Sequence, residues 1–261
     1  MNLDHIVRAL EGIALPTVAV DLEAFDRNLE RHLTMARSHG LTLHFATKSI
    51  RVRSLIERAS TGKGARGLLT FTVAEAAALA QGGLDDLFVA YPTLQPSAFA
   101  RLAELTERGV NISLAVDSTD AVSQLAALGK ARGLALRVVL CIDMSLRALG
   151  LHLGVRRSPL RTPQDVIALA ERARDLGLVV HGVMGYEAQV AGLGDDSPFD
   201  AAPLRLTKRA VRAASMRELA QRRSAIVAEL RARRFALAFV NGGGTGSLDL
   251  TTTQTGVTEV S

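Results

Sequence analysis

Lys48 follows the apolar run LHFAT at residues 43–47, where a buried strand is expected to end. The chain contains only four lysines, so its positive charge depends on arginine, and a lysine here is not the usual solubilising choice. A lysine amine in a poorly hydrated site loses its proton more readily and can form a Schiff base with a carbonyl group. The alternative is a strand-end lysine whose ammonium group reaches water. Lys48 is therefore a candidate nucleophile.

A run of glycines follows another apolar stretch, in the segment VNGGGTGS at residues 240–247. Glycines let backbone N–H groups converge on an anion, and the hydroxyl groups of Thr245 and Ser247 add donors. The alternative is a flexible turn. Because phosphate sites of barrel enzymes lie late in the chain, the run from Gly242 to Gly246 predicts a phosphate-binding loop.

Two further side chains follow expected strand ends. Arg147, in IDMSLRALG, could hold a carboxylate, a phosphate or a ring nitrogen, or it could form an ordinary ion pair with Asp143. Tyr186, in MGYEAQ, is one of two tyrosines, and it could contact a ligand ring or cap the core. Both alternatives remain open for each residue.

Other patterns argue against specific sites. Residues 62–67, GKGARG, match the glycine pattern of dinucleotide-binding proteins, but a helix precedes them and a strand follows, so we expect an exposed turn. Cys141 lies inside an apolar run and is interpreted as a small buried hydrophobe. The six histidines show no metal-ligand spacing, and no metal site is predicted.

Strands and helices alternate along the chain, which is typical of an α/β fold. Strands with helical connections predict a (β/α)8 TIM-like barrel plus one extra strand, and an open doubly wound sheet is the alternative. Long loops are expected at residues 150–165 and 191–203, on the side of the barrel where active sites form. The expected strands are residues 17–21, 43–47, 67–71, 86–90, 112–116, 136–142, 179–184, 237–241 and 257–260.

The net charge of +5 could suggest a nucleic-acid partner. The arginines are instead spread along helix-like segments such as 206–234 and alternate with Glu218 and Glu229, while aromatic residues make up 4% of the chain. Neither nucleic-acid binding nor membrane insertion is therefore expected. The opening residues do not resemble a secretory signal, and one cysteine permits no internal disulfide, so we expect a cytoplasmic protein.

Six motifs, taken in order, resemble the alanine racemase N-terminal-domain superfamily, the barrel class (fold-type III) of pyridoxal 5'-phosphate (PLP) enzymes. The resemblance runs from about Leu15 to the end and is greatest to the D-threonine aldolase and D-serine dehydratase-like amino acid deaminase/aldolase group. The motifs are LPTVAVDLEAFDRNL, ATKS, GLLTFTVAEAAALAQGGLDDLFVAYP, IDMSLRALG, GYEAQ and NGGGTGS.

This resemblance implies a PLP-dependent lyase, an aldolase or dehydratase/deaminase, that acts on a small amino-acid substrate through a Schiff base at Lys48. Arg147 would face the pyridine nitrogen, and Tyr186 would lie near the ring and the substrate. Gly243, Gly244, Thr245 and Gly246 would hold the phosphate. The alternatives are an amino-acid racemase and a non-enzymatic PLP-carrier protein. A homodimer would also fit the resemblance.

The chain also differs from the pattern of this family in two ways. Many relatives carry His where this chain has Gln189, and they continue into a C-terminal β domain that bears the ligands of a divalent metal. We expect residues 1–22 to form an N-terminal helix and the extra strand, and residues 23–261 to form the PLP-binding barrel. The chain is then expected to be a fragment that lacks the metal ligands, binds PLP weakly and has little lyase activity alone.

Overall fold

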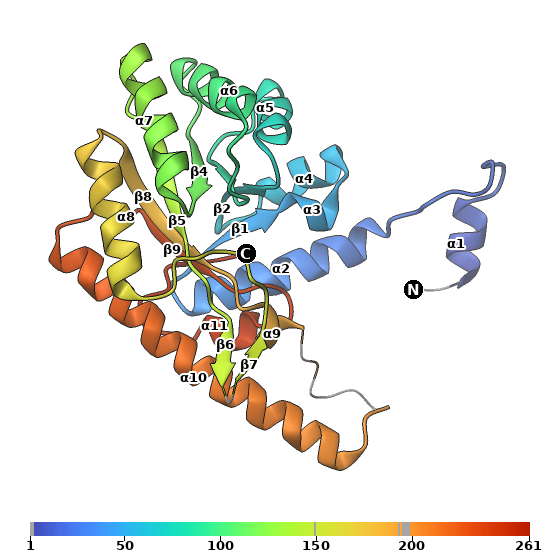
Figure 1. Ribbon diagram of the computed structural model, residues 1–261. Coiled ribbons are helices and arrows are strands. Elements are labelled where there is room, and N and C mark those ends of the chain that lie inside the picture. The colour runs from blue at the N-terminus through green and yellow to red at the C-terminus, as the bar shows by residue number, and fades with distance from the viewer. Residues whose placement is uncertain (1–2, 149, 193, 195–198) are drawn as a thin grey trace.

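The computed structural model describes residues 3–148, 150–192, 194 and 199–261, and in this part of the chain eight parallel strands close into a barrel (Figure 1). The strand order around the barrel is β1-β10-β9-β8-β5-β4-β3-β2. The predicted (β/α)8 barrel is confirmed, and the alternative prediction of an open doubly wound sheet is wrong. The barrel strands are β1 (Thr42–Ala46), β2 (Ala65–Thr70), β3 (Leu87–Val89), β4 (Ile112–Val116), β5 (Arg137–Cys141), β8 (Val179–Gly185), β9 (Phe239–Gly242) and β10 (Glu259–Val260).

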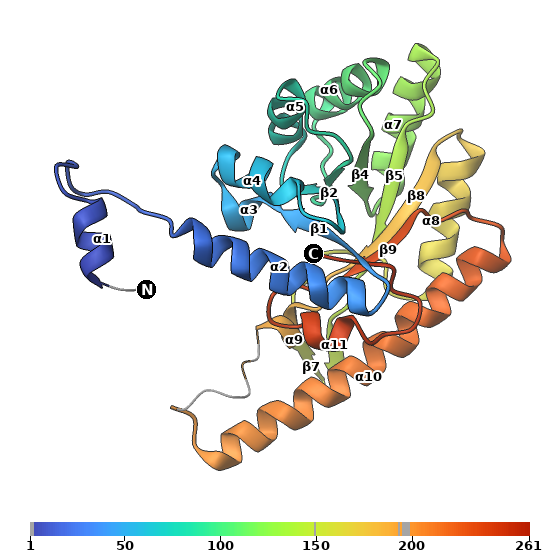
Figure 2. The ribbon, with the colours of Figure 1, turned by 180° about the vertical axis from the view of Figure 1, so that it is seen from behind.

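Helices cover the outside of the barrel, and α2 and α10 are both long (Figure 2). Local sequence sets their ends: the side chains of Asp21 and Ser118 accept hydrogen bonds from the first turns of α2 and α7, and Gly133 ends α7 in the left-handed conformation. The helices are α1 (Leu3–Ala9), α2 (Leu22–Ser38), α3 (Thr47–Ile50), α4 (Arg53–Ser60), α5 (Val73–Gln81), α6 (Pro96–Glu107), α7 (Thr119–Arg132), α8 (Pro163–Asp175), α9 (Ala188–Ala191), α10 (Ala202–Ala232) and α11 (Leu248–Thr251).

The core has two layers, one inside the barrel and one between the barrel and the helices, because strands such as β4 are buried on both faces. In β4 all five residues are buried; Leu114 packs outward against the helices and Ala115 packs inside the barrel. Phe88 and Phe239 fill the barrel interior, with their ring centroids 5.5 Å apart. Burial on both faces explains why these strands appear in the sequence as continuous apolar runs.

A polar layer closes the amino ends of the strands. Arg66 Nε lies 3.3 Å from Asp86 Oδ2 and donates its Nη1 hydrogen to the carbonyl of Ala238 at 3.2 Å. Asn111 Nδ2 donates to Asp86 Oδ1 at 3.0 Å, and its Oδ1 accepts from Arg137. The polar groups of this layer are thus bonded to one another and to a neighbouring carbonyl group.

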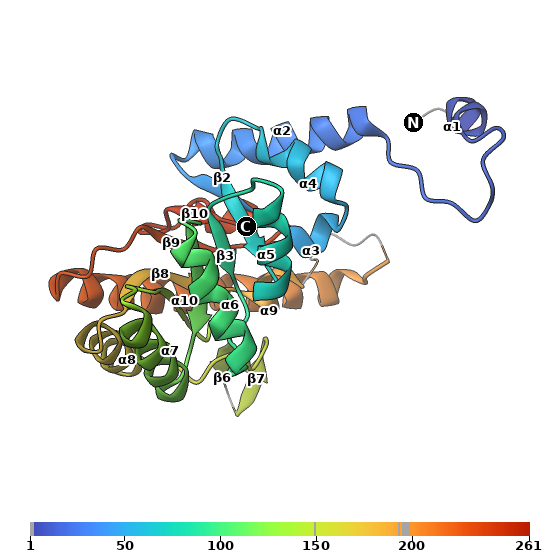
Figure 3. The ribbon, with the colours of Figure 1, turned by 90° about the horizontal axis from the view of Figure 1, so that it is seen from above.

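The extra strand expected at residues 17–21 is wrong. α1 is present near the expected place, but residues 17–20 lie in no β-ladder, and Val18 is 92% exposed. Figure 3 shows α1 and the segment after it extending away from the barrel. A strand needs partners for its N–H and C=O groups, and no described strand lies beside this segment. The proposed division of the chain at residue 22 stays a prediction.

The expected loops and turn are only partly correct. Within 150–165, β7 (Leu151–Leu153) pairs antiparallel with β6 (Leu146–Ala148), and α8 begins at Pro163. The loop at 191–203 falls partly outside the described residues, and its last residues already belong to α10. The motif at 62–67 is a turn only up to Gly64, because β2 begins at Ala65. None of the helices in the described part of the chain is long and apolar enough to cross a membrane.

Candidate active site

A cavity of about 510 Å³ opens at the carboxyl ends of the barrel strands. Lys48 enters it after β1, Tyr186 after β8 and the glycine loop after β9. The structure therefore brings together most of the predicted site residues, namely Lys48, Tyr186, Gly243, Gly244, Thr245 and Gly246.

Lys48 lies in the short helix α3, which begins as soon as β1 ends. The neighbouring Thr47 is buried, and its hydroxyl group donates to the carbonyl of Leu69 at 3.3 Å, which ties α3 to β2. Lys48 Nζ donates to the phenol oxygen of Tyr91 at 3.1 Å. The amine is thus exposed to the cavity while its backbone is fixed.

The glycine loop, residues 243–246, depends on the absence of side chains. A Cβ atom at Gly246 would lie 2.2 Å from the carbonyl oxygen of Ala191, and one at Gly244 would lie 2.9 Å from the ring of Tyr186. Gly243 has φ +85°. Among the described residues, no hydrogen bond occupies the N–H groups of Gly244, Thr245 and Gly246. The loop therefore offers free donors to an anion.

A buried ion pair between Glu187 and Arg223 holds the glycine loop in place. Glu187, the residue after Tyr186, accepts from the N–H of Gly243 at 2.9 Å and from Thr251 Oγ1 at 2.8 Å. Arg223, on α10, donates to the same carboxylate at 3.1 Å and to the carbonyl of Gly185 at 2.8 Å. Because a buried carboxylate needs a paired charge and filled hydrogen bonds, Arg223 allows Glu187 to lie under an anion site.

Arg147 lies elsewhere. It belongs to β6, its side chain is 56% exposed, and its Nη2 is 3.1 Å from Asp143 Oδ2. It lines a second cavity, of about 680 Å³, with residues of the β6–β7 hairpin. The expected place of Arg147 beside a cofactor ring does not match this position, and the alternative ion pair with Asp143 does.

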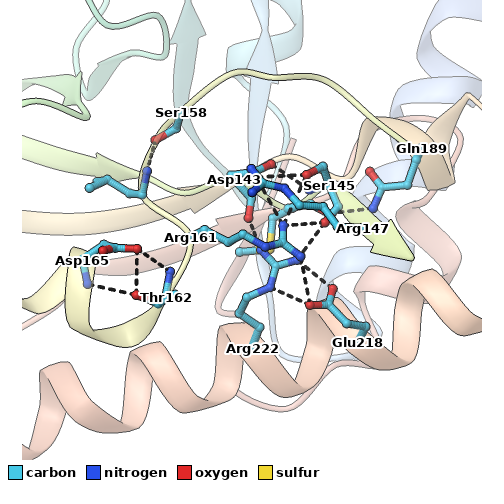
Figure 4. Close-up of polar contacts among 12 residues, drawn as sticks. Asp143, Ser145, Arg147, Ser158, Arg161, Thr162, Asp165, Gln189, Glu218 and Arg222 are labelled. Atoms are coloured by element: carbon cyan, nitrogen blue, oxygen red, sulfur yellow. Dashed lines mark hydrogen bonds and ion pairs between the residues drawn. The ribbon is translucent and has the colours of Figure 1, made fainter. Parts of the chain in front are cut away.

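Asp143 is the centre of the network in Figure 4. Its carboxylate accepts from the N–H and the hydroxyl of Ser145, both at 2.9 Å, and from Arg161 at 3.2 Å. Burial alone would raise the pKa of Asp143, but these hydrogen bonds and the charge of Arg161 outweigh it, and the pKa is lowered. Arg222 and Glu218 extend the network onto α10.

This network ties the two ends of segment 143–161 together. The N–H of Asp143 donates to the carbonyl of Leu160 at 2.8 Å, and Ser158 Oγ donates to the carbonyl of Cys141 at 2.6 Å. The closed segment carries Arg157 into the cavity, where its Nη2 donates to the carbonyl of Ala90 at 2.8 Å. Sequence reasoning missed Arg157 because its place depends on the β6–β7 hairpin.

Tyr91 was missed too, although a signal existed: it follows the strand predicted at 86–90, as Lys48 follows β1.

A group of hydrogen-bonded polar side chains inside the barrel was also missed. His44 Nδ1 lies 2.5 Å from Glu259 Oε2, and Asn241 Nδ2 donates to Glu259 Oε1 at 2.9 Å. Both His44 and Asn241 line the cavity from below.

Cys141 and Gln189 are both buried. Burial raises the pKa of Cys141 to about 12, which fits the interpretation as a small buried hydrophobe. Gln189 is buried, and its amide donates to the carbonyl of Met144 at 2.6 Å and to Ser215 Oγ at 2.9 Å. Within the described ranges, no three His, Cys, Asp or Glu side chains gather in a way that could hold a metal.

The sequence model of the protein family "Alanine racemase, N-terminal domain" matches residues 20–244 of this chain. The chain belongs to this family. It is 30% identical over 242 residues to a 3-hydroxy-D-aspartate aldolase of Paracoccus denitrificans, covering 90% of this chain and 55% of that protein. It is 26% identical to a D-threonine aldolase of an Arthrobacter species, covering 92% and 57% respectively.

Among solved structures, the D-threonine aldolase of Filomicrobium marinum superposes with a TM-score of 0.81 at 21% identity, over 95% of this chain and 61% of that one. This likeness supports the barrel fold. The chain spans a little over half the length of these two curated relatives.

Proposed function

We propose that the chain is the PLP-binding barrel of an amino-acid lyase that acts on a D-β-hydroxy amino acid. The observation that carries this proposal is one cavity that is lined both by Lys48 and by a glycine loop whose N–H donors no described residue occupies. The names of the relatives support the substrate class, since they are aldolases of 3-hydroxy-D-aspartate and D-threonine.

The described residues fit PLP in three respects. Lys48 supplies an amine for the aldehyde, and the glycine loop supplies donors for the phosphate in a cradle that a Cβ atom would fill. The ring of Tyr186 lies against Gly244 and would form a wall beside the cofactor ring. When bound, PLP supplies an electron sink that stabilises negative charge on the amino acid.

Arg157 is the better candidate for the group that faces the pyridine nitrogen, because it lines the cavity and Arg147 does not. A guanidinium group disfavours protonation of that nitrogen, which weakens the electron sink and leaves the choice of reaction to other groups. We also propose a cytoplasmic location, and the homodimer stays a prediction.

The test is to add D- and L-β-hydroxy amino acids to the PLP-loaded protein, with and without divalent metal, and to analyse the products. We expect the D-compounds to change the cofactor spectrum and, because this chain spans only a little over half the length of the curated relatives, to yield only slowly an aldehyde with glycine, or a keto acid with ammonia. Lys48→Met should abolish both effects, and the matched control Lys63→Met should keep them. The opposite enantiomer as sole product would indicate a racemase, and an unchanged spectrum would indicate a carrier; either contradicts the proposal.

A further inference from the structure

Tyr91 is the side chain that the amine of Lys48 contacts. It lies two residues after β3 and lines the cavity, and its phenol oxygen accepts the hydrogen bond from Lys48 Nζ at 3.1 Å. A lysine ammonium group has three donors and no acceptor, so the phenol must be the acceptor in this pair. In the described part of the chain, no other hydrogen bond of Nζ is present.

The ring of Tyr91 is held on two sides. The guanidinium carbon of Arg157 lies 4.3 Å from the ring centroid, and the ring of Phe71 meets it edge-on at 4.5 Å. Arg157 also donates to the carbonyl of Ala90, the residue before Tyr91. Cation–π and edge-to-face contacts are both attractive, so together they keep the phenol beside Lys48.

The hydrogen of the Tyr91 hydroxyl group remains available. Because the phenol oxygen uses a lone pair for Lys48, its hydrogen is left to bond a different acceptor, and none is bonded to it among the described residues. The closed segment 143–161 that delivers Arg157 therefore also places a free proton donor next to the candidate nucleophile. A side chain that only formed the cavity wall would not need this arrangement.

We propose that Tyr91 is a further catalytic residue, which holds the amine of Lys48 and relays a proton when Lys48 becomes linked to the cofactor aldehyde. The lysine nitrogen forms a bond to the carbonyl carbon, and the carbonyl oxygen leaves as water. Lys48 reacts as the neutral amine, after its ammonium group has released one proton to water. The two hydrogens of the departing water correspond to the two that the amine then loses: Tyr91 gives its hydroxyl proton to the carbonyl oxygen and takes one proton from the nitrogen in return, so it ends as a phenol. This inference rests on the proposed function.

The test separates cofactor binding from covalent capture. Pyridoxamine 5'-phosphate has the ring and the phosphate but no aldehyde, so its affinity reports the cavity alone. Stopped-flow absorbance with saturating PLP reports the rate of capture. We expect Tyr91→Phe to keep the pyridoxamine 5'-phosphate affinity and to slow capture by about 100-fold, in the range of general acid–base catalysis. In the control Tyr186→Phe, which removes the other phenol of the cavity, the effect should fall mainly on affinity.

Each outcome decides one of the two claims. If pyridoxamine 5'-phosphate does not bind the parent protein, the proposed function fails. If it binds but Tyr91→Phe captures PLP at the parent rate, or loses pyridoxamine 5'-phosphate affinity while folded, the role of Tyr91 is overturned.

A second measurement covers the case in which Tyr91→Phe does not fold. The chain has two tyrosines, so in a Tyr186→Phe background 3-fluorotyrosine labels position 91 alone. Fluorine lowers the pKa of a phenol with little change of shape. The pH profile of capture should therefore move to lower pH, and an unmoved profile would overturn the inference.

Discussion

The two ends of the barrel are both polar, but they differ in how their hydrogen bonds are filled. At the amino ends, Arg66, Asp86 and Asn111 pair with one another and with neighbouring carbonyl groups. At the carboxyl ends, the amine of Lys48 faces the cavity and the glycine loop keeps N–H groups that no described residue occupies. Polar residues at strand ends therefore indicate a ligand site only where donors are left over.

The largest effect is expected at the glycine loop. Gly246→Ala places a Cβ atom 2.2 Å from the carbonyl oxygen of Ala191, so the loop must shift away from its anion. Loss of a charged hydrogen bond costs about 1.5–3 kcal/mol, or about 10- to 100-fold in PLP affinity. The affinity for pyridoxal, which lacks the phosphate, should not change, as isothermal titration can measure.

A matched control is Gly83→Ala. Gly83 has φ +83° with no atom within 4 Å of its would-be Cβ, so alanine there costs about 1 kcal/mol of backbone strain without touching the site. It should lower the free energy of unfolding and leave PLP affinity unchanged. Equal losses of PLP affinity in both variants would contradict a specific phosphate loop.

At the opposite end of the barrel we expect the reverse pattern. Asn111→Ala removes the partner of Asp86 and Arg137, and leaving polar groups without partners costs about 1–3 kcal/mol in the free energy of unfolding. PLP capture by the folded protein should stay at the parent rate. A variant that keeps its stability but loses the cofactor would remove the contrast between the two ends.

Asp143 gives a smaller effect that depends on pH. Its folded pKa is lowered, so its stabilisation is complete above its unfolded pKa of about 3.9 and is lost as the pH falls through the folded value. Asp143→Asn should lower the free energy of unfolding by about 1 kcal/mol at neutral pH, since it weakens charge-assisted hydrogen bonds. In urea unfolding at several pH values, the difference from the parent should shrink below about pH 4. A difference that grows in acid would contradict the network.

The smallest effect is expected at Arg147. Its ion pair with Asp143 is half exposed, so Arg147→Met should change the free energy of unfolding by less than about 1 kcal/mol. The spectrum of bound PLP should stay the same, whereas the matched variant Arg157→Met should alter it. The opposite result would restore Arg147 to the place beside the cofactor ring.

The sequence was sufficient to predict the place of a residue where that place depends only on the strand before it. The apolar run before Lys48 and the strand before the glycine loop both end at the cavity, since all parallel strands present their carboxyl ends at one edge. Most of the barrel strands could be predicted because burial on both faces makes runs such as residues 112–116 almost entirely apolar.

The sequence was insufficient where a position depends on distant contacts. Arg147 and Arg157 lie ten residues apart near the same strand end. Arg147 is held in the β6–β7 pairing, and the bonds that close segment 143–161 bring Arg157 to the cavity. Residues 17–21 alternate like a strand, but strand formation needs a neighbour that no described element provides.

The central claim is that this cavity binds PLP through Lys48. Its most direct test is reduction of the PLP-loaded chain with borohydride, followed by peptide mapping of the pyridoxyl label across the four lysines. We predict label on Lys48 alone, with loading lowered in Gly246→Ala and unchanged in Asn111→Ala. Label on Lys63, Lys130 or Lys208, or no label at any concentration of PLP, would contradict it.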